Sequence, residues 1–144
     1  MKIQVSRVPD EGLKLEGTYD SLTLDIARED AHPAAPVSLQ GLARKEEDEL
    51  IVEANVRCVL ECTCARCLTC FESVIKKDCF FTYDVSARHV VDITDDVRQE
   101  VMLDFPLIPV CQDDCRGLCP RCGHNLNESD CAHQLGMEDD QGAE

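Results

Sequence analysis

The chain has 144 residues, of which 44 % are hydrophobic and 30 % are charged, a size that fits one domain with a modest core. No run approaches the roughly 20 apolar residues of a membrane helix, and residues 1–7 lack the apolar stretch of a secretory signal. We therefore expect a cytoplasmic protein without membrane contact, in a reducing compartment where disulfides are rare. Trp is absent, aromatic residues make up 4 %, and there are eleven cysteines.

The charge is strongly acidic and unevenly distributed. The chain has fourteen basic and twenty-nine acidic residues, and its net charge is −15. Residues 92–144 carry three basic and thirteen acidic residues, a net charge of −10. This surface repels phosphate backbones and so disfavours direct RNA contact; it suits a basic protein partner, or it serves solubility alone. Between residues 57 and 91 the chain is nearly neutral, and a local basic face there would use Arg57, Arg66, Lys76 and Lys77.

The first third of the chain has weak secondary-structure signals. Residues 2–8 alternate as a short strand, residues 10–35 are weakly patterned, and residues 31–36 have the composition of a loop. Residues 37–43 then place alternate apolar side chains on one strand face. The acidic run at 46–49 is expected to be a turn.

A long β-hairpin is predicted next. Apolar and polar residues alternate from Val52 to Cys64 and again from Phe71 to Val85, and a period of two over this length indicates half-buried strands. The motif Cys64-Ala65-Arg66-Cys67 therefore lies at the tip of the hairpin. Four other cysteines fall within the strands and are expected to be small buried hydrophobic residues: Cys58, Cys62, Cys70 and Cys79.

A helix is predicted to begin near residues 92–96. Asp or Thr would supply the N-cap, and acidic residues in the first turn suit the helix dipole. Ile93, Val97 and Val101 follow at helical spacing, and Pro106 ends the helix. After the helix comes a cysteine-rich segment, residues 111–133, and then an acidic flexible tail, residues 136–144.

The cysteine-rich segment has the spacing of a metal-binding region. A two-residue gap between cysteines lets both sulfurs bind one ion, and in Cys119-Pro120-Arg121-Cys122-Gly123 the Pro and Gly favour the tight turn that this needs. Thiolate-rich ligand sets select zinc or iron–sulfur chemistry. A redox-active CxxC usually opens a helix, whereas the first CxxC here joins two strands. This placement favours a structural role, and no catalytic motif stands out.

Two groupings of the ligands remain open, and we favour the first of them. One has two sites, Cys64, Cys67, Cys111 and Cys115 in the first and Cys119, Cys122, Cys131 and His133 in the second. The other has a single site made of Cys64, Cys67, Cys119 and Cys122. His124 competes with His133 as a ligand, and we favour His133 because Cys131 lies only two residues away. Asn125 and Asn127 are expected to form turns.

These motifs resemble the YceD family, whose members are called large ribosomal RNA subunit accumulation proteins. The resemblance rests on three stretches, 64–68, 105–109 (Phe-Pro-Leu-Ile-Pro) and 117–128 (Gly-Leu-Cys-Pro-Arg-Cys-Gly-His-Asn-Leu-Asn-Glu), followed by Cys131. It implies a non-enzymatic factor needed for large-subunit ribosomal RNA to accumulate. The family gene often neighbours one for a small zinc-ribbon protein of the large subunit, which suggests a protein partner.

We predict an α+β fold: a twisted antiparallel sheet with a long β-hairpin, one packed helix and a zinc-bound C-terminal segment. Residues 1–135 form a single YceD-like domain with its core at 37–110. One or two zinc ions would tie down loops that a small core cannot hold. The expected function is ribosome assembly through a basic ribosomal protein or a pre-ribosomal particle. The alternative is an iron-binding redox protein that uses the 119–122 motif.

Overall fold

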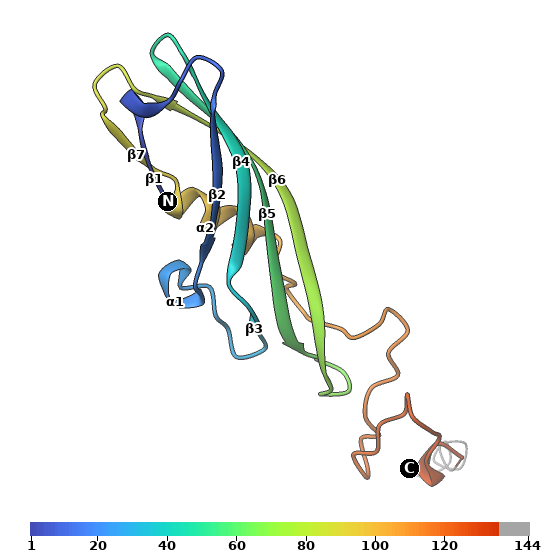
Figure 1. Cartoon of the computed structure of the whole chain (residues 1–144). Coiled ribbons are helices and arrows are strands. Elements are labelled where there is room, and N and C mark those ends of the chain that lie inside the picture. The colour runs from blue at the N-terminus through green and yellow to red at the C-terminus, as the bar shows by residue number, and fades with distance from the viewer. Residues whose placement is uncertain (136–144) are drawn as a thin grey trace, which may run out of the picture.

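The long hairpin predicted from the alternating pattern forms the centre of the fold (Figure 1). In the computed structural model, which describes residues 1–135, β5 (Glu49–Thr63) and β6 (Cys70–Asp84) pair antiparallel over their whole lengths. The side chains of β5 alternate strictly, and every second one from Leu50 to Cys62 is buried. The predicted acidic turn also forms, since Glu46 pairs with Glu49 across it.

Three more strands complete the main sheet: β2 (Leu13–Tyr19), β3 (Ala31–Pro33) and β4 (Val37–Glu46). Both β4 and β3 lie on the side of β5 opposite β6, with β4 beside its first half and β3 beside its second half, and β2 pairs with β4. Within residues 1–135, β6 pairs with β5 alone and is therefore an edge strand. A second sheet has two strands, β1 (Lys2–Gln4) and β7 (Val90–Asp92).

The N-terminal third is more ordered than its sequence pattern indicated. The strand expected over 2–8 is shorter, because the 3-10 helix η1 (Val5–Arg7) follows β1 directly. The weakly patterned region contains β2 and a short helix, α1 (Ser21–Leu24). The prediction of a loop over 31–36 is wrong for its first half, because β3 pairs there with β5.

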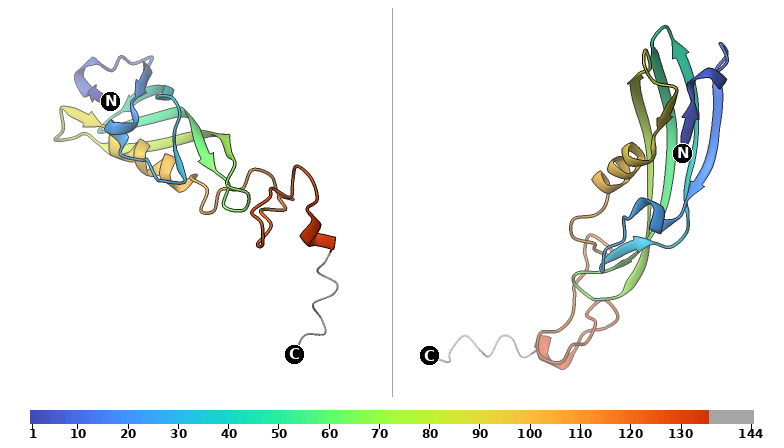
Figure 2. Two further views of the ribbon diagram at one scale, coloured as in Figure 1. Left: turned by 90° about the horizontal axis from the view of Figure 1, so that it is seen from below. Right: turned by 90° about the vertical axis from the view of Figure 1, so that its left-hand side faces the viewer.

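The predicted helix, α2 (Thr94–Leu103), packs against β5, β6 and α1 (Figure 2). Its buried side chains are Val97 and Val101, as the helical spacing indicated. Its N-cap is Ile93, not Asp or Thr, so the N-cap side chain makes no capping hydrogen bond. The carboxylate of Asp92 acts one residue earlier and accepts a hydrogen bond from the Thr94 amide at 3.0 Å.

The antiparallel sheet and the packed helix confirm the α+β class. One hydrophobic core joins the sheet, α1, α2 and the small sheet. Cys58, Cys62 and Cys79 are buried as expected, but Cys70 is exposed because it faces away from this core. Among residues 1–135, no helix has the length and apolar character needed to cross a membrane.

The cysteine-rich segment lies beyond the hairpin tip, at the far end of the molecule from the turn between β4 and β5, in every view (Figures 1 and 2). It contains little regular structure apart from α3 (Ala132–Leu135). The acidic tail predicted for 136–144 lies outside the described residues.

Candidate metal centres

The hairpin tip and the chain that follows α2 meet at the first group of cysteines. At the tip, the Cys64 amide donates to the Thr69 carbonyl at 2.9 Å, and Leu68 has a left-handed φ of 61°. The Ala65 amide donates to the Pro109 carbonyl at 2.8 Å. This bond holds residues 109–115, called the returning chain below, against the tip. Cys111, two residues after Pro109, therefore reaches the turn.

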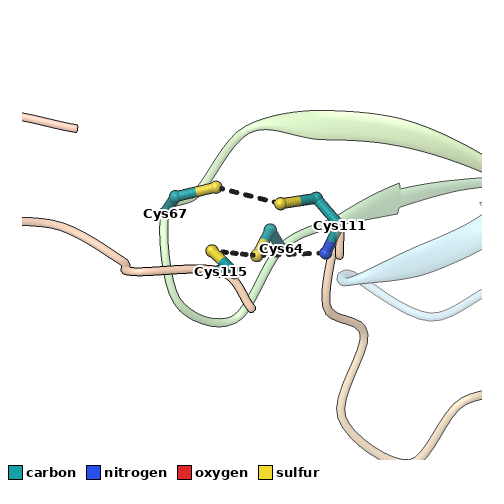
Figure 3. Close-up of side chains that lie close together, drawn as sticks. All are labelled: Cys64, Cys67, Cys111 and Cys115. Atoms are coloured by element: carbon teal, nitrogen blue, oxygen red, sulfur yellow. Dashed lines mark hydrogen bonds between the residues drawn. The ribbon is translucent and has the colours of Figure 1, made fainter. Parts of the chain in front are cut away.

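The first cluster contains Cys64 and Cys67 from the tip and Cys111 and Cys115 from the returning chain (Figure 3). The Sγ atoms of Cys64 and Cys115 are 3.7 Å apart, and those of Cys67 and Cys111 are 3.6 Å apart. All four Sγ atoms lie within 4.8 Å of one another. Four Zn–S bonds of about 2.3 Å in a tetrahedron place the sulfurs about 3.8 Å apart. The spacing and the all-sulfur donor set therefore fit a tetrahedral ion.

Backbone and side-chain N–H groups surround these sulfurs. The Arg66 and Cys111 amides each donate to the Cys64 Sγ at 3.4 Å. The Asn127 side-chain amide donates to the Cys115 Sγ at 3.2 Å. Cys64, Cys67 and Cys115 are buried, and Cys111 is half-buried. N–H donors aimed at sulfur favour the thiolate, which is the form that binds metal.

Two neighbouring thiols of this cluster have opposite pKa shifts. Burial raises the pKa of Cys64, but amides of Cys67, Cys111 and Arg66 outweigh burial and lower it to about 6. Burial and the adjacent thiols raise the pKa of Cys111 to about 12. Thiolates this close repel one another, so the cluster cannot carry four negative charges without a cation. Metal binding here must release protons.

The second cluster brings together Cys119, Cys122, Cys131 and His133, whose ligand atoms also lie within 4.8 Å of one another. The turn that joins the first two is closed by the Gly123 amide, which donates to the Cys119 carbonyl at 2.9 Å, and Gly123 has a φ of 73°. Amides of Cys122 and Arg121 lower the pKa of Cys119 to about 6. Three thiols and one imidazole are a common zinc ligand set.

The structure places His133, rather than His124, beside the thiols. The Cys131 Sγ and the His133 Nδ1 are 4.0 Å apart, and His133 lies on α3. The His124 ring is bonded elsewhere, with its Nε2 2.8 Å from the Ser129 Oγ and 3.1 Å from the Ser129 carbonyl.

The eight cysteine and histidine residues thus lie in the two groups of the two-site scheme. The single-site alternative needs the 64–67 and 119–122 motifs to share one ion, and the structure assigns them to different groups. That these residues bind metal stays a prediction.

The basic face considered for residues 57–91 does not form as one surface. Arg57 on β5 and Lys76 on β6 lie opposite each other in the strand register. Lys77 points to the opposite face and forms ion pairs with Glu100 at 2.9 Å and Asp104 at 3.0 Å. The guanidinium of Arg66, at the tip, donates to the carbonyls of Asp113 and Cys115. Arg66 is an exposed turn residue that also links the tip to the cysteine-rich segment.

Sequence reasoning also missed the role of Asn127. It was expected to form a turn, and it does bond the neighbouring Asn125. Its side chain also reaches the Cys115 Sγ, twelve residues away, in the other cluster. No local pattern signals this contact, because it depends on how the two clusters sit relative to each other.

Comparison with known proteins supports the resemblance. One family model matches the chain over residues 82–142, and its description is Large ribosomal RNA subunit accumulation protein YceD. The YceD resemblance is confirmed over this segment. The YceD match includes α2, the returning chain and all four residues of the second cluster. Cys64 and Cys67 lie before it.

Several mycobacterial proteins are similar to this chain. A protein of Mycobacterium leprae, described as uncharacterized, is 30 % identical over 108 residues, which cover 64 % of this chain and 50 % of that protein. Uncharacterized proteins of Mycobacterium bovis and Mycobacterium tuberculosis are 37 % identical over 76 residues, covering 42 % of this chain and 37 % of each protein. The chain thus spans half the length of these relatives or less. No solved structure matches it.

Proposed function

We propose that this chain is a non-enzymatic factor that supports accumulation of large-subunit ribosomal RNA during ribosome assembly. The YceD match over residues 82–142 is the observation that carries this proposal. In the proposed mechanism, the chain binds a basic ribosomal protein or a pre-ribosomal particle in the cytoplasm. Two zinc ions hold the binding end of the molecule in shape, and residues 1–135 act as one domain.

Zinc has a structural role in this proposal, because each candidate site offers four protein ligands and leaves no position open for a reacting molecule. The first ion would join the hairpin tip to the returning chain, which are 44 residues apart at Cys67 and Cys111. The second would close the 119–133 loop. Both ions would shape a segment that has few apolar side chains to pack.

The surface next to the first cluster supports binding to a protein that is both basic and apolar. The end of α2 and the loop after it expose three large apolar side chains: Leu103 at 74 %, Leu107 at 91 % and Ile108 at 70 %. Large apolar side chains exposed within a short stretch of chain make that stretch a candidate contact site. Residues 92–144 carry a net charge of −10, and an acidic segment complements a basic partner.

The broad function is tested by genetics. We expect a deletion strain to show a lowered ratio of large- to small-subunit ribosomal RNA, restored by the wild-type gene. A variant with Leu107→Ser and Ile108→Ser should fold but fail to restore the ratio. Leu22→Ser is the matched control, because Leu22 is 89 % exposed on α1 and lies outside this surface. An unchanged ratio in the deletion strain would refute the proposed function.

The partner is tested by photo-crosslinking. A benzophenone amino acid at position 107 should crosslink in cells to a basic ribosomal protein that mass spectrometry identifies, whereas the same group at position 22 should not. Crosslinks from position 107 mainly to ribosomal RNA would rule out a ribosomal protein as the direct contact, and crosslinks to a second copy of this chain would contradict both proposed partners.

The metal is tested by native mass spectrometry with optical absorption. We expect two zinc ions per chain and a colourless protein. A coloured protein with iron at Cys119 and Cys122 would instead support the redox alternative, and one ion per chain would contradict the two-site arrangement.

A further inference from the structure

We propose that the second cluster organises the first, and that Asn127 is the positioning residue that couples them. This inference rests on the proposed binding of metal at both clusters. It predicts that the hairpin-tip site binds zinc tightly only when the 119–133 loop has closed around its own ion. The two sites would then fill in a fixed order, the second cluster before the first.

The coupling contact is the hydrogen bond from the Asn127 Nδ2 to the Cys115 Sγ, at 3.2 Å. Cys115 supplies one of the four sulfurs of the first cluster. An N–H donor at this distance stabilises the thiolate and also fixes the direction in which the sulfur points. Groups that orient a metal ligand in this way contribute substantially to metal affinity.

The side chain of Asn127 is held on its other side as well. Its Oδ1 accepts a hydrogen bond from the Arg116 amide at 2.9 Å and another from the Gln112 side chain at 3.3 Å. Because the oxygen is occupied by donors, the amide cannot turn over without losing them. The Nδ2 group therefore stays directed at the sulfur, and also at the Asn125 Oδ1, 3.0 Å away.

The backbone of Asn127 is set by the loop of the second cluster. The Asn127 amide donates to the Asn125 Oδ1 at 3.0 Å, and the Leu126 amide donates to the Gly117 carbonyl at 2.9 Å. Leu118 and Asn125 form a β-bridge, which encloses Cys119 and Cys122. Closure of the second cluster thus fixes the position from which Asn127 reaches Cys115.

The same loop rests directly on the hairpin tip. The Asn125 Nδ2 donates to the Thr69 Oγ1 at 3.3 Å. Gly117 has a φ of 76°, and a Cβ there would lie 3.2 Å from the Arg66 carbonyl oxygen. These contacts place the loop against the turn that supplies Cys64 and Cys67, so the two sites are close enough to be coupled through it.

The test measures zinc affinity by competition with a chromogenic chelator, with cobalt spectra to separate the sites. A four-thiolate site and a three-thiolate, one-imidazole site give different cobalt bands. Asn127→Ala should weaken zinc binding at the first site by about 10- to 100-fold, the range for loss of such an orienting group. Asn55→Ala is the matched control, because it removes the same side chain from an exposed hydrogen bond to Asp78 within the sheet and belongs to neither cluster, and we expect a change of less than about threefold.

A second variant tests the order of filling. Cys122→Ser with His133→Ala removes the second site and should lower zinc affinity at the first site as far as Asn127→Ala does, although it leaves all four first-site sulfurs in place. Adding Asn127→Ala to it should then have little further effect. Far-ultraviolet circular dichroism should show an intact sheet in every variant.

The outcomes separate this inference from the proposed function. Wild-type protein that binds no zinc overturns the metal role and this inference together. Wild-type protein with two ions, alongside an Asn127→Ala variant whose first site binds within about threefold of wild type, overturns the coupling alone. An unchanged first site in the variant that lacks the second site would also overturn it.

Discussion

Removal of metal should unfold the cysteine-rich end of the molecule and leave the β-sheet in place. The sheet, α1 and α2 share one core of buried apolar residues, which includes Leu39, Leu50 and Val97. The first cluster belongs to a separate small group, with Cys64, Cys67 and Cys115 at its centre. Beyond residue 110, the buried apolar side chains among the described residues are two cysteines and Leu126. Without an ion, little remains to order this segment.

The expected size of the effect follows from binding linkage. An ion that binds only the closed state at a free concentration 100 times its Kd stabilises that state by about 2.7 kcal/mol, which is about a 100-fold change in the opening equilibrium. Burial of one leucine contributes about 1.5–3 kcal/mol, whereas ordering each residue costs about 1–2 kcal/mol. One leucine therefore cannot keep residues 111–133 ordered by itself.

Hydrogen exchange with mass spectrometry, at a series of buffered free zinc concentrations, measures this effect. Protection of the tip at 64–69, whose opening releases one ion, should fall about tenfold for each tenfold fall in free zinc, until it is lost. Protection of residues 111–133, which hold ligands of both ions, should fall more steeply. Strands β4 and β5 should remain protected after chelation. Cys67→Ser should reproduce the loss at the tip, and Cys70→Ser, an exposed thiol outside both clusters, should behave as wild type. Complete exchange of β4 and β5 on chelation would refute the separation of core and metal segment.

Three further predictions concern the domain itself. Gly41→Ala should destabilise the fold by about 1–3 kcal/mol in chemical denaturation, because its Cβ would lie 2.3 Å from a β5 carbonyl oxygen. Gly17→Ala is the control, because its Cβ would meet only the end of a methionine side chain. Equal stability of the two variants would contradict this prediction. In the zinc-loaded protein Cys70 should react quickly with iodoacetamide and Cys58 should not, since burial raises the pKa of Cys58 to about 11; mass spectrometry of labelled peptides checks the order. Hydrogen bonds from Thr94 at the start of α2 lower the pKa of Asp92, so its carboxylate adds stability above the unfolded value of 3.8 and loses it as pH falls through the lower folded pKa. The stability gap between wild type and Asp92→Asn, measured with chelator present, should therefore narrow as pH falls below 3.8.

The hairpin could be predicted from the sequence because its alternation is long and regular. Fifteen residues of β5 with every second one buried leave little freedom in register. In β2, by contrast, Gly17 interrupts a short alternation, and in β3 a proline and neighbouring small residues resemble a loop. Those two strands form because β4 and β5 offer them open edges, which is a tertiary effect that local sequence does not carry.

The candidate site was predictable in its residues but not in its grouping. The CxxC and CPxCG motifs identify metal-ligand residues by local spacing alone. Which motifs share an ion depends on where α2 returns the chain, and the bond between Ala65 and Pro109 that fixes this return joins residues 44 positions apart. The contact between Asn127 and Cys115 has the same long-range origin.

Among residues 1–135 one side of β6 has no partner strand, and this has a consequence for how the protein behaves at high concentration. A strand of fifteen residues with open backbone groups is a template on which another chain could add itself and begin an aggregate. Charged side chains recur along it, with Glu72, Lys76 and Asp78 on its outward face. Neutralising these charges would therefore show first as precipitation from concentrated solution, well before any loss of the folded state.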